Sequence, residues 1–259
     1  MDPLSALPTL SSSYAIILFL MTVRTSALLL TTPIFGARTV PSVTKIGLAL
    51  VLSLVLLPTT AAHAIAPESF GSLLVAIGKE TLVGLLAGLA VTLLYATLQI
   101  VATLASQQIG FGFAGTVDIE FAGQSPILDH LFTGMATLVF LTGNFHHLFL
   151  MGIQRLFDAM PLGAFSFSRT SPEALVRLSA DMFLVAVQIV LPLVGALLLT
   201  EVALGVISKT APQMNVFFVG MPIKIAVGIL AIILVMPFVV DRTETLFGNV
   251  AQAMALVIR

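Results

Sequence analysis

The sequence predicts an all-α, membrane-associated protein, and three observations lead to this prediction. Of the 259 residues, 58% are hydrophobic and only 9% are charged, whereas soluble domains hold roughly 45–50% apolar and about 25% charged residues. Long apolar runs recur along the chain, and a bilayer-crossing helix requires such runs. Segments rich in Pro, Gly and polar residues separate them. A soluble globular enzyme is therefore excluded as the leading interpretation.

Six apolar runs are the candidate membrane helices. In chain order they are Tyr14–Leu30, Ile46–Leu57, Phe70–Ala105, Ile127–Leu150, Leu175–Ile207 and Val216–Val240. About 20 helical residues cross about 30 Å of hydrocarbon, so the second run is short and the third and fifth are too long for one simple crossing. Pro192 and Pro222 each remove a backbone hydrogen bond, which predicts a bend in the last two helices. We expect these two to form a kinked hairpin that turns at Ala211–Asn215.

The two ends of the chain have different characters. Residues Met1–Ser13 contain neither Lys nor Arg, so the positive segment that begins a cleavable signal peptide is missing, and we expect insertion as a mature polytopic protein. At the other end, apolar residues recur at spacings of four, four and three, namely Leu246, Val250, Met254 and Val257. This spacing predicts that Asp241–Arg259 is an amphipathic helix.

Composition excludes several classes of function. The net charge of −1 provides no basic surface for nucleic acid. The absence of cysteine excludes disulfides, thiolate nucleophiles and Cys-based metal sites. His146 and His147 are consecutive, so they diverge on a helix and do not form a metal pair. We therefore expect no enzyme, no cofactor and no metal site. The chain also lacks Trp, although membrane proteins usually place aromatic rings at both interfaces.

Several ionisable residues lie in or beside the apolar runs. They are Arg24, Lys79, Glu80, Glu201, Lys209 and Lys224. Each would cost at least about 2.5–3.5 kcal/mol in lipid, so each should face protein or water. Glu201 and Lys209 are too far apart along one helix to pair, and Lys79 and Glu80 point about 100° apart, so each needs a separate partner. These groups could form a proton relay or hydrogen bonds between subunits, and their scattered placement favours the second interpretation.

A glycine-rich segment, Ser106–Gly115, follows the third apolar run. Gly110, Gly112 and Gly115 allow backbone conformations that other residues avoid, while Ile109, Phe111 and Phe113 alternate with them as apolar side chains. The segment lacks the Lys and Ser/Thr of a phosphate-binding loop. From composition alone it is equally an apolar stopper or a connector that needs tight turns.

Gly84 and Gly88 form a small-xxx-small pattern within the third run. Such a pattern permits two membrane helices to approach closely. It is also common by chance in so apolar a chain.

Two stretches together identify a family resemblance. The first is Arg24–Leu30 with Thr32–Pro41 and Lys45–Ala49, and the second is Glu201–Phe217 with Gly220–Lys224. In combination they resemble the FliR family of bacterial flagellar export-gate proteins, which has related members in virulence type III secretion systems.

The resemblance implies a fold of long kinked helical hairpins that assemble with like hairpins of partner subunits into a helical export gate. Residues 1–174 would be a FliP-like helical region with a glycine-rich plug loop near 106–118, and residues 175–259 a FliQ-like kinked hairpin. The partners implied are FliP and FliQ in a hetero-oligomer, FlhB around the cytoplasmic mouth, and the exported flagellar proteins. The implied location is the bacterial inner membrane, in the flagellar basal body.

The resemblance also assigns roles to particular residues. The pore plug would comprise Gln107, Gln108, Ile109, Gly110, Phe111, Gly112, Phe113 and Gly115. The polar contacts between subunits would comprise Arg24, Arg38, Glu80, Glu201, Asn215 and Lys224. The alternative is a small secondary transporter that couples to protons through Glu80 or Glu201.

Overall fold

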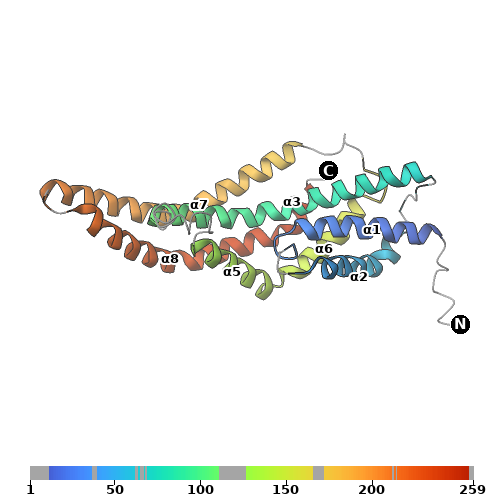
Figure 1. Ribbon diagram of the computed structural model, residues 1–259, viewed down its shortest axis with the longest axis horizontal. Helices are drawn as coiled ribbons and strands as arrows, with labels where there is room; N and C mark the ends of the chain where they lie inside the picture. Colours follow the sequence, from blue (N-terminus) through green and yellow to red (C-terminus); the bar gives the residue numbers. More distant parts are fainter. Residues whose placement is uncertain are drawn as a thin grey trace. The chain divides into compact units, whose positions relative to one another are not determined.

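The computed structural model confirms an all-α protein and describes residues 12–36, 40–61, 64, 67, 69–110, 127–165, 172–211, 213 and 215–256. The helices in this part of the chain are α1 (Ser12–Thr31), α2 (Ser42–Thr60), α3 (Phe70–Ile109), α5 (Ile127–Thr142), α6 (Phe145–Ala159), α7 (Pro172–Thr210), α8 (Val216–Gly248) and α9 (Val250–Leu256) (Figure 1). No strand occurs within the described ranges.

Five of these helices are long and apolar enough to cross a membrane, namely α1, α2, α3, α7 and α8. Two sequence predictions need correction. The second run is not short, because α2 extends beyond it at both ends and has 19 residues. The fourth run is not one helix, because α5 ends at Thr142 and α6 begins at Phe145. Asn144, between them, has φ +57°, a left-handed conformation that ends α5.

The carboxy-terminal part follows the predicted hairpin. Helix α7 ends at Thr210 and α8 begins at Val216, which confirms the predicted turn (Figure 1). Both helices continue through their prolines, including a further one at Pro237 in α8. The predicted helical tail is confirmed up to Leu256, as the end of α8 and as α9, where Val250 and Met254 are buried. Val257 lies outside the described residues.

The chain forms two compact units, each built from separate stretches of sequence. Unit 1 comprises Met1–Leu93, His146–Leu178 and Asn249–Arg259. Unit 2 comprises Leu94–Phe145 and Ser179–Gly248. The division into regions 1–174 and 175–259 follows from the resemblance and stays a prediction.

Unit 1 has a core of aromatic and small side chains. The rings of Phe35 and Phe149 stack with their centroids 5.0 Å apart. Gly152 of α6 lies against α9, because a Cβ at this position would be 2.8 Å from the sulfur of Met254.

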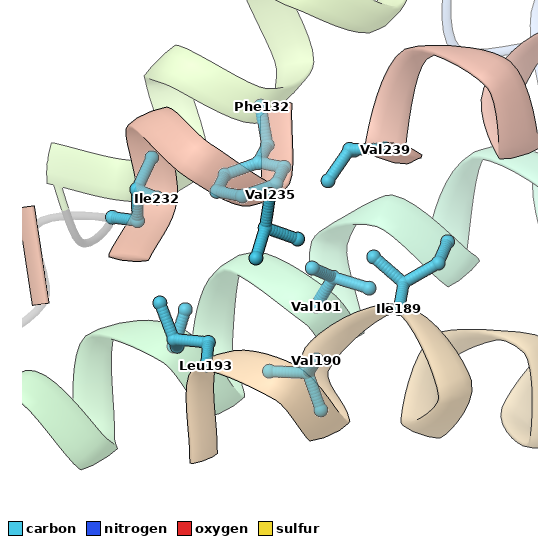
Figure 2. A pocket seen from close by; sticks show the side chains of 9 residues that line it. Val101, Phe132, Ile189, Val190, Leu193, Ile232, Val235 and Val239 are labelled. Atoms are coloured by element: carbon cyan, nitrogen blue, oxygen red, sulfur yellow. The ribbon is translucent and has the colours of Figure 1, made fainter. Parts of the chain in front are cut away.

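Unit 2 packs segments of four helices around aliphatic side chains. Figure 2 shows Val101 from α3, Phe132 from α5, Ile189 from α7 and Val239 from α8 converging on one point, where they enclose an apolar cavity of about 10 Å³. This volume is near the minimum for a single water, and a water there would need polar partners that these side chains do not offer. The cavity therefore belongs to the packed core and is too small for a substrate.

Candidate functional site: two ion pairs in an apolar chain

The first ion pair joins Arg24 of α1 to Glu80 of α3 within unit 1. Both Nε and Nη2 of Arg24 face Oε2 of Glu80, and both side chains are 0% exposed. A charge placed in an apolar environment is tolerated only when a partner compensates it. The two residues predicted to need protein partners therefore provide them for each other.

The pair also binds the backbone that follows α6. Nη1 of Arg24 donates a hydrogen bond to the Met160 carbonyl at 2.7 Å, and the Gly163 amide donates one to Oε1 of Glu80 at 2.9 Å. The Arg24 guanidinium also lies 4.8 Å from the centre of the Phe157 ring, within the range of a cation–π interaction. The pair thus links α1 and α3 to the end of α6.

The contact between α1 and α3 continues along one face of α3, at intervals of four residues from Glu80. A Cβ at Gly84 would overlap the Arg24 carbonyl, and one at Gly88 would overlap the Thr31 hydroxyl. Four residues after Gly88, the Thr92 hydroxyl donates a hydrogen bond to the Thr31 carbonyl at 2.8 Å. The small-xxx-small pattern is therefore a real close approach of two helices, as such patterns permit.

The assignment of polar residues to contacts between subunits stays a prediction, and the structure shows their surroundings within the chain. Arg24 and Glu80 bind each other and have no exposed surface, so their polar groups are already used inside the chain. Arg38 lies outside the described residues. Asn215 is exposed just before α8. Its carbonyl accepts a hydrogen bond from the Phe218 amide at 3.1 Å. Its role between subunits stays a prediction.

The second ion pair joins Glu201 of α7 to Lys224 of α8 within unit 2. The Lys224 side chain is 26% exposed and the Glu201 side chain 43% exposed. Neither residue was predicted to pair with the other, although both lie nearly equally far along the chain from the turn at Gln213. In a hairpin this symmetry places two residues side by side, so it is the signal that could have found the pair.

The glycine-rich segment is only partly described. Gln107, Gln108 and Ile109 form the last turn of α3, which corrects the prediction that the loop begins at Ser106. Gly110 ends the helix with φ +101°, a conformation that favours glycine, and donates its amide to the Ser106 carbonyl at 3.1 Å. The predicted plug residues Phe111, Gly112, Phe113 and Gly115 lie outside the described residues.

Ile109 anchors this end of α3 in unit 2. Its side chain is 0% exposed, and a Cβ at Gly228 of α8 would lie 2.5 Å from its Cγ1 atom. Ile109 therefore fits into a space that Gly228 leaves open. It points into the packed interior at the last residue of the helix.

Within the described ranges, no three His, Cys, Asp or Glu side chains are placed to hold a metal ion. His146 and His147 lie against each other with ring centroids 4.2 Å apart, so the prediction that these two side chains diverge is wrong.

The part of the chain that the structure describes has five helices long and apolar enough to cross a membrane and two ion pairs between its helices, features that define a polytopic α-helical membrane protein. Residues 15–250 match the family described as Bacterial export proteins, family 1. The chain belongs to this family. It is similar to the Flagellar biosynthetic protein FliR of Bacillus subtilis (strain 168), with 34% identity over 91% of this chain and 92% of that protein. The Flagellar biosynthetic protein FliR of Escherichia coli (strain K12) is 29% identical over 91% of this chain and 90% of that protein.

A protein with a different name is also similar to this chain. The Yop proteins translocation protein T of Yersinia pestis is 26% identical over 73% of both chains. The FliR relatives thus extend over most of this chain, as the resemblance in two stretches predicted.

Proposed function

We propose that the chain is a core subunit of a type III export gate of the flagellar kind, which forms with FliP and FliQ the conduit for unfolded flagellar proteins. Its relatives are named for flagellar biosynthesis and for Yop translocation, and its family is one of export proteins. The structural observation that best supports an assembled role is the exposure of the α7–α8 hairpin.

The hairpin leaves most of its apolar surface uncovered in the single chain. Only 22% of the most apolar stretch of α8 is buried, against 56% for α3. Leu199 on α7 is 70% exposed and Leu234 on α8 is 80% exposed. Contiguous apolar surface on this scale indicates contact with lipid or with other protein.

The Glu201–Lys224 pair favours protein over lipid at this part of the hairpin. Each charge facing hydrocarbon would cost at least about 2.5–3.5 kcal/mol. Polar and charged groups are instead common where membrane helices pack on one another. We therefore assign Glu201 and Lys224 to a surface that like hairpins of partner subunits cover.

The same proposal sets the surroundings of the chain. It places the chain in the bacterial inner membrane within the flagellar basal body, with FlhB around the cytoplasmic mouth of the gate. The missing Trp residues are consistent with this arrangement, because an interfacial aromatic belt serves surfaces that face lipid headgroups.

Proton-coupled transport is the competing function, and the geometry at Glu80 disfavours it. Glu80 is 0% exposed, its Oε2 faces Arg24 and its Oε1 accepts the Gly163 amide. A carboxylate that exchanges protons during transport needs access to water and a free oxygen. Glu201 is more exposed but also paired.

Native mass spectrometry of the chain co-expressed with FliP and FliQ tests the assembly. We expect one chain of this protein among several copies of each unlike partner. A stable and active homo-oligomer would instead support the transporter.

Replacement of Glu201 by Gln tests the hairpin surface. We expect assembly with the partners to weaken before transport fails in any complex that does assemble, because the ion pair lies at the covered surface. Glu244→Gln is the matched control, because Glu244 is an exposed carboxylate on α8 without an ion pair among the described residues. Normal assembly combined with lost proton coupling would favour the transporter.

Deletion of residues 110–115 tests the predicted plug. Because these residues would close the pore, we expect membranes carrying the variant gate to leak ions or small molecules while export persists. Unchanged leakage in an assembled gate would rule out the stopper and leave the connector.

A further inference from the structure

Lys79 of α3 carries a positive charge for which unit 1 shows no counter-ion. The sequence predicts separate partners for Lys79 and Glu80, and the structure supplies one to Glu80, namely Arg24. The other carboxylate oxygen of Glu80 accepts a backbone amide, so both oxygens are already bound. Among the described residues, no carboxylate lies within ion-pair distance of Lys79. The predicted partner of Lys79 is therefore missing from the described part of the chain.

The surface around Lys79 is apolar. Residues three and four positions away on a helix are its neighbours on the helix surface, and for Lys79 these are Val75, Ala76, Leu82 and Val83. Ala76 and Val83 are buried, whereas Val75 is 58% and Leu82 38% exposed. Lys79 thus lies at the border between the buried and the exposed face of α3, and is itself partly buried. No neighbour on the helix offers a group that could compensate its charge.

The start of α3 is too far away to bring the ammonium of Lys79 to water. Lys79 follows the first residue of the helix, Phe70, by nine positions, which is about 14 Å along the axis. A lysine near a helix end can extend its ammonium to the membrane surface, but its side chain is shorter than this distance. Residues 70–78 contain one polar side chain, Ser72. In hydrocarbon the charge would cost at least about 2.5–3.5 kcal/mol, so it needs an anion beside α3.

We propose that Lys79 lies on a docking surface for a helix of a partner subunit, and that a carboxylate on that helix pairs with its ammonium. A carboxylate neutralises the charge, and two opposite charges that are bonded to each other are tolerated in an apolar contact where one alone is not. A Cβ at the adjacent Gly78 would meet nothing within 4 Å, which leaves room for a close approach. The inference rests on the proposed function, and it adds a contact in unit 1 to the hairpin surface of unit 2.

Replacement of Lys79 by Gln separates this contact from those inside the chain. Because Lys79 has no partner among the described residues, Lys79→Gln should leave the unfolding midpoint of the single chain unchanged, whereas Glu80→Gln at the next position removes the counter-ion of Arg24. On co-expression with FliP and FliQ, we expect the fraction of Lys79→Gln recovered in the complex to fall by more than about tenfold, since the partner's carboxylate is left uncompensated. Lys79→Arg keeps the charge and should assemble.

Carbodiimide cross-linking of the purified complex identifies the carboxylate directly. Dicyclohexylcarbodiimide is apolar and activates carboxylates in apolar surroundings, and an amine in contact then forms an amide bond as the reagent leaves as its urea. Glu201 and Lys224 are in contact within this chain and provide the internal positive control. By mass spectrometry we expect a second link, which joins Lys79 to an Asp or Glu of FliP or FliQ. It should be absent from Lys79→Arg, because a guanidinium keeps the charge without forming this bond.

The outcomes separate this inference from the proposed function. An assembled complex in which Glu201 links to Lys224 but Lys79 stays unlinked overturns the inference alone, since water or a lipid phosphate then neutralises the charge. Normal assembly of Lys79→Gln, or a link from Lys79 to a carboxylate of this same chain, also overturns it. Absence of any complex with FliP and FliQ contradicts the proposed function and, with it, this inference.

Discussion

Replacing Glu80 by Gln should destabilise the chain strongly, because it removes a charge without removing the group that the charge compensates. The amide of Gln keeps an oxygen that can accept the Gly163 amide, which now bonds Oε1 of Glu80 at 2.9 Å. The positive guanidinium of Arg24 then stays 0% exposed without a counter-ion. The substitution thus isolates the charge from the hydrogen bond.

The size of the effect follows from burial. Removal of one partner from a buried pair typically costs about 3–5 kcal/mol, since the remaining charge is uncompensated. Glu80→Ala should cost about 1–3 kcal/mol more, because it also leaves the Gly163 amide without its acceptor. The same Glu-to-Gln change at Glu201, whose side chain is 43% exposed, should cost about 0–1 kcal/mol in the isolated chain.

The assay is unfolding of the purified chain in mixed micelles by titration with a denaturing detergent, followed by circular dichroism. Glu201→Gln serves as the control, since it makes the same chemical change at a partly exposed pair. The charge-reversed variant Arg24→Glu with Glu80→Arg adds a geometric test. Because the Met160 carbonyl needs a donor and the Gly163 amide needs an acceptor, reversal should not restore stability.

Two results would refute this reasoning. If the free energy of unfolding of Glu80→Gln lies within about 1 kcal/mol of that of the unmodified chain, the pair does not behave as a buried pair. If the reversed pair recovers the original stability, charge attraction alone stabilises the contact and the two backbone hydrogen bonds are incidental.

Two further predictions concern glycines at close contacts. Gly88→Val should lower the free energy of unfolding by about 1–3 kcal/mol through overpacking, because its Cβ would overlap the Thr31 hydroxyl. A Cβ at Gly78 would have no neighbour within 4 Å. Gly78→Ala should therefore be neutral or slightly stabilising in the same unfolding assay. Gly228→Ala should clash with Ile109, and Ile109→Ala alone should leave a cavity costing about 2–5 kcal/mol. The double variant should be more stable than the sum of the two losses implies, and simple additivity would show that the two residues are not in contact.

The helices of this chain could be predicted more fully than the contacts between them. An apolar run of sufficient length predicts a membrane helix by itself, and the turn at Ala211–Asn215 follows from local composition. The break between α5 and α6 was missed because the apolar pattern continues across it. The adjacent Gly143 and Asn144 were the available signal, since both residues favour turns.

The partner of a buried charge could not be predicted from local sequence. The cost of Arg24 in an apolar run shows only that it must face protein or water. Arg24 meets Glu80 because of the way α1 packs on α3. This packing depends on Gly84 and Gly88, where the two helices approach closely and are thereby aligned. The glycine pattern was visible, but a pattern on one helix does not identify the helix that packs against it.

The two ion pairs place opposite demands on their surroundings. Arg24 and Glu80 are linked to three helices inside unit 1, so this pair is satisfied in the single chain and can form before any partner binds. Glu201 and Lys224 pair with each other, but their side chains stay 43% and 26% exposed on an apolar hairpin. In hydrocarbon an exposed charged pair is unfavourable, whereas a contacting helix with polar or small residues would relieve it. Arg24–Glu80 is therefore a finished polar contact in the single chain, whereas Glu201–Lys224 is the contact that the proposed assembly would complete.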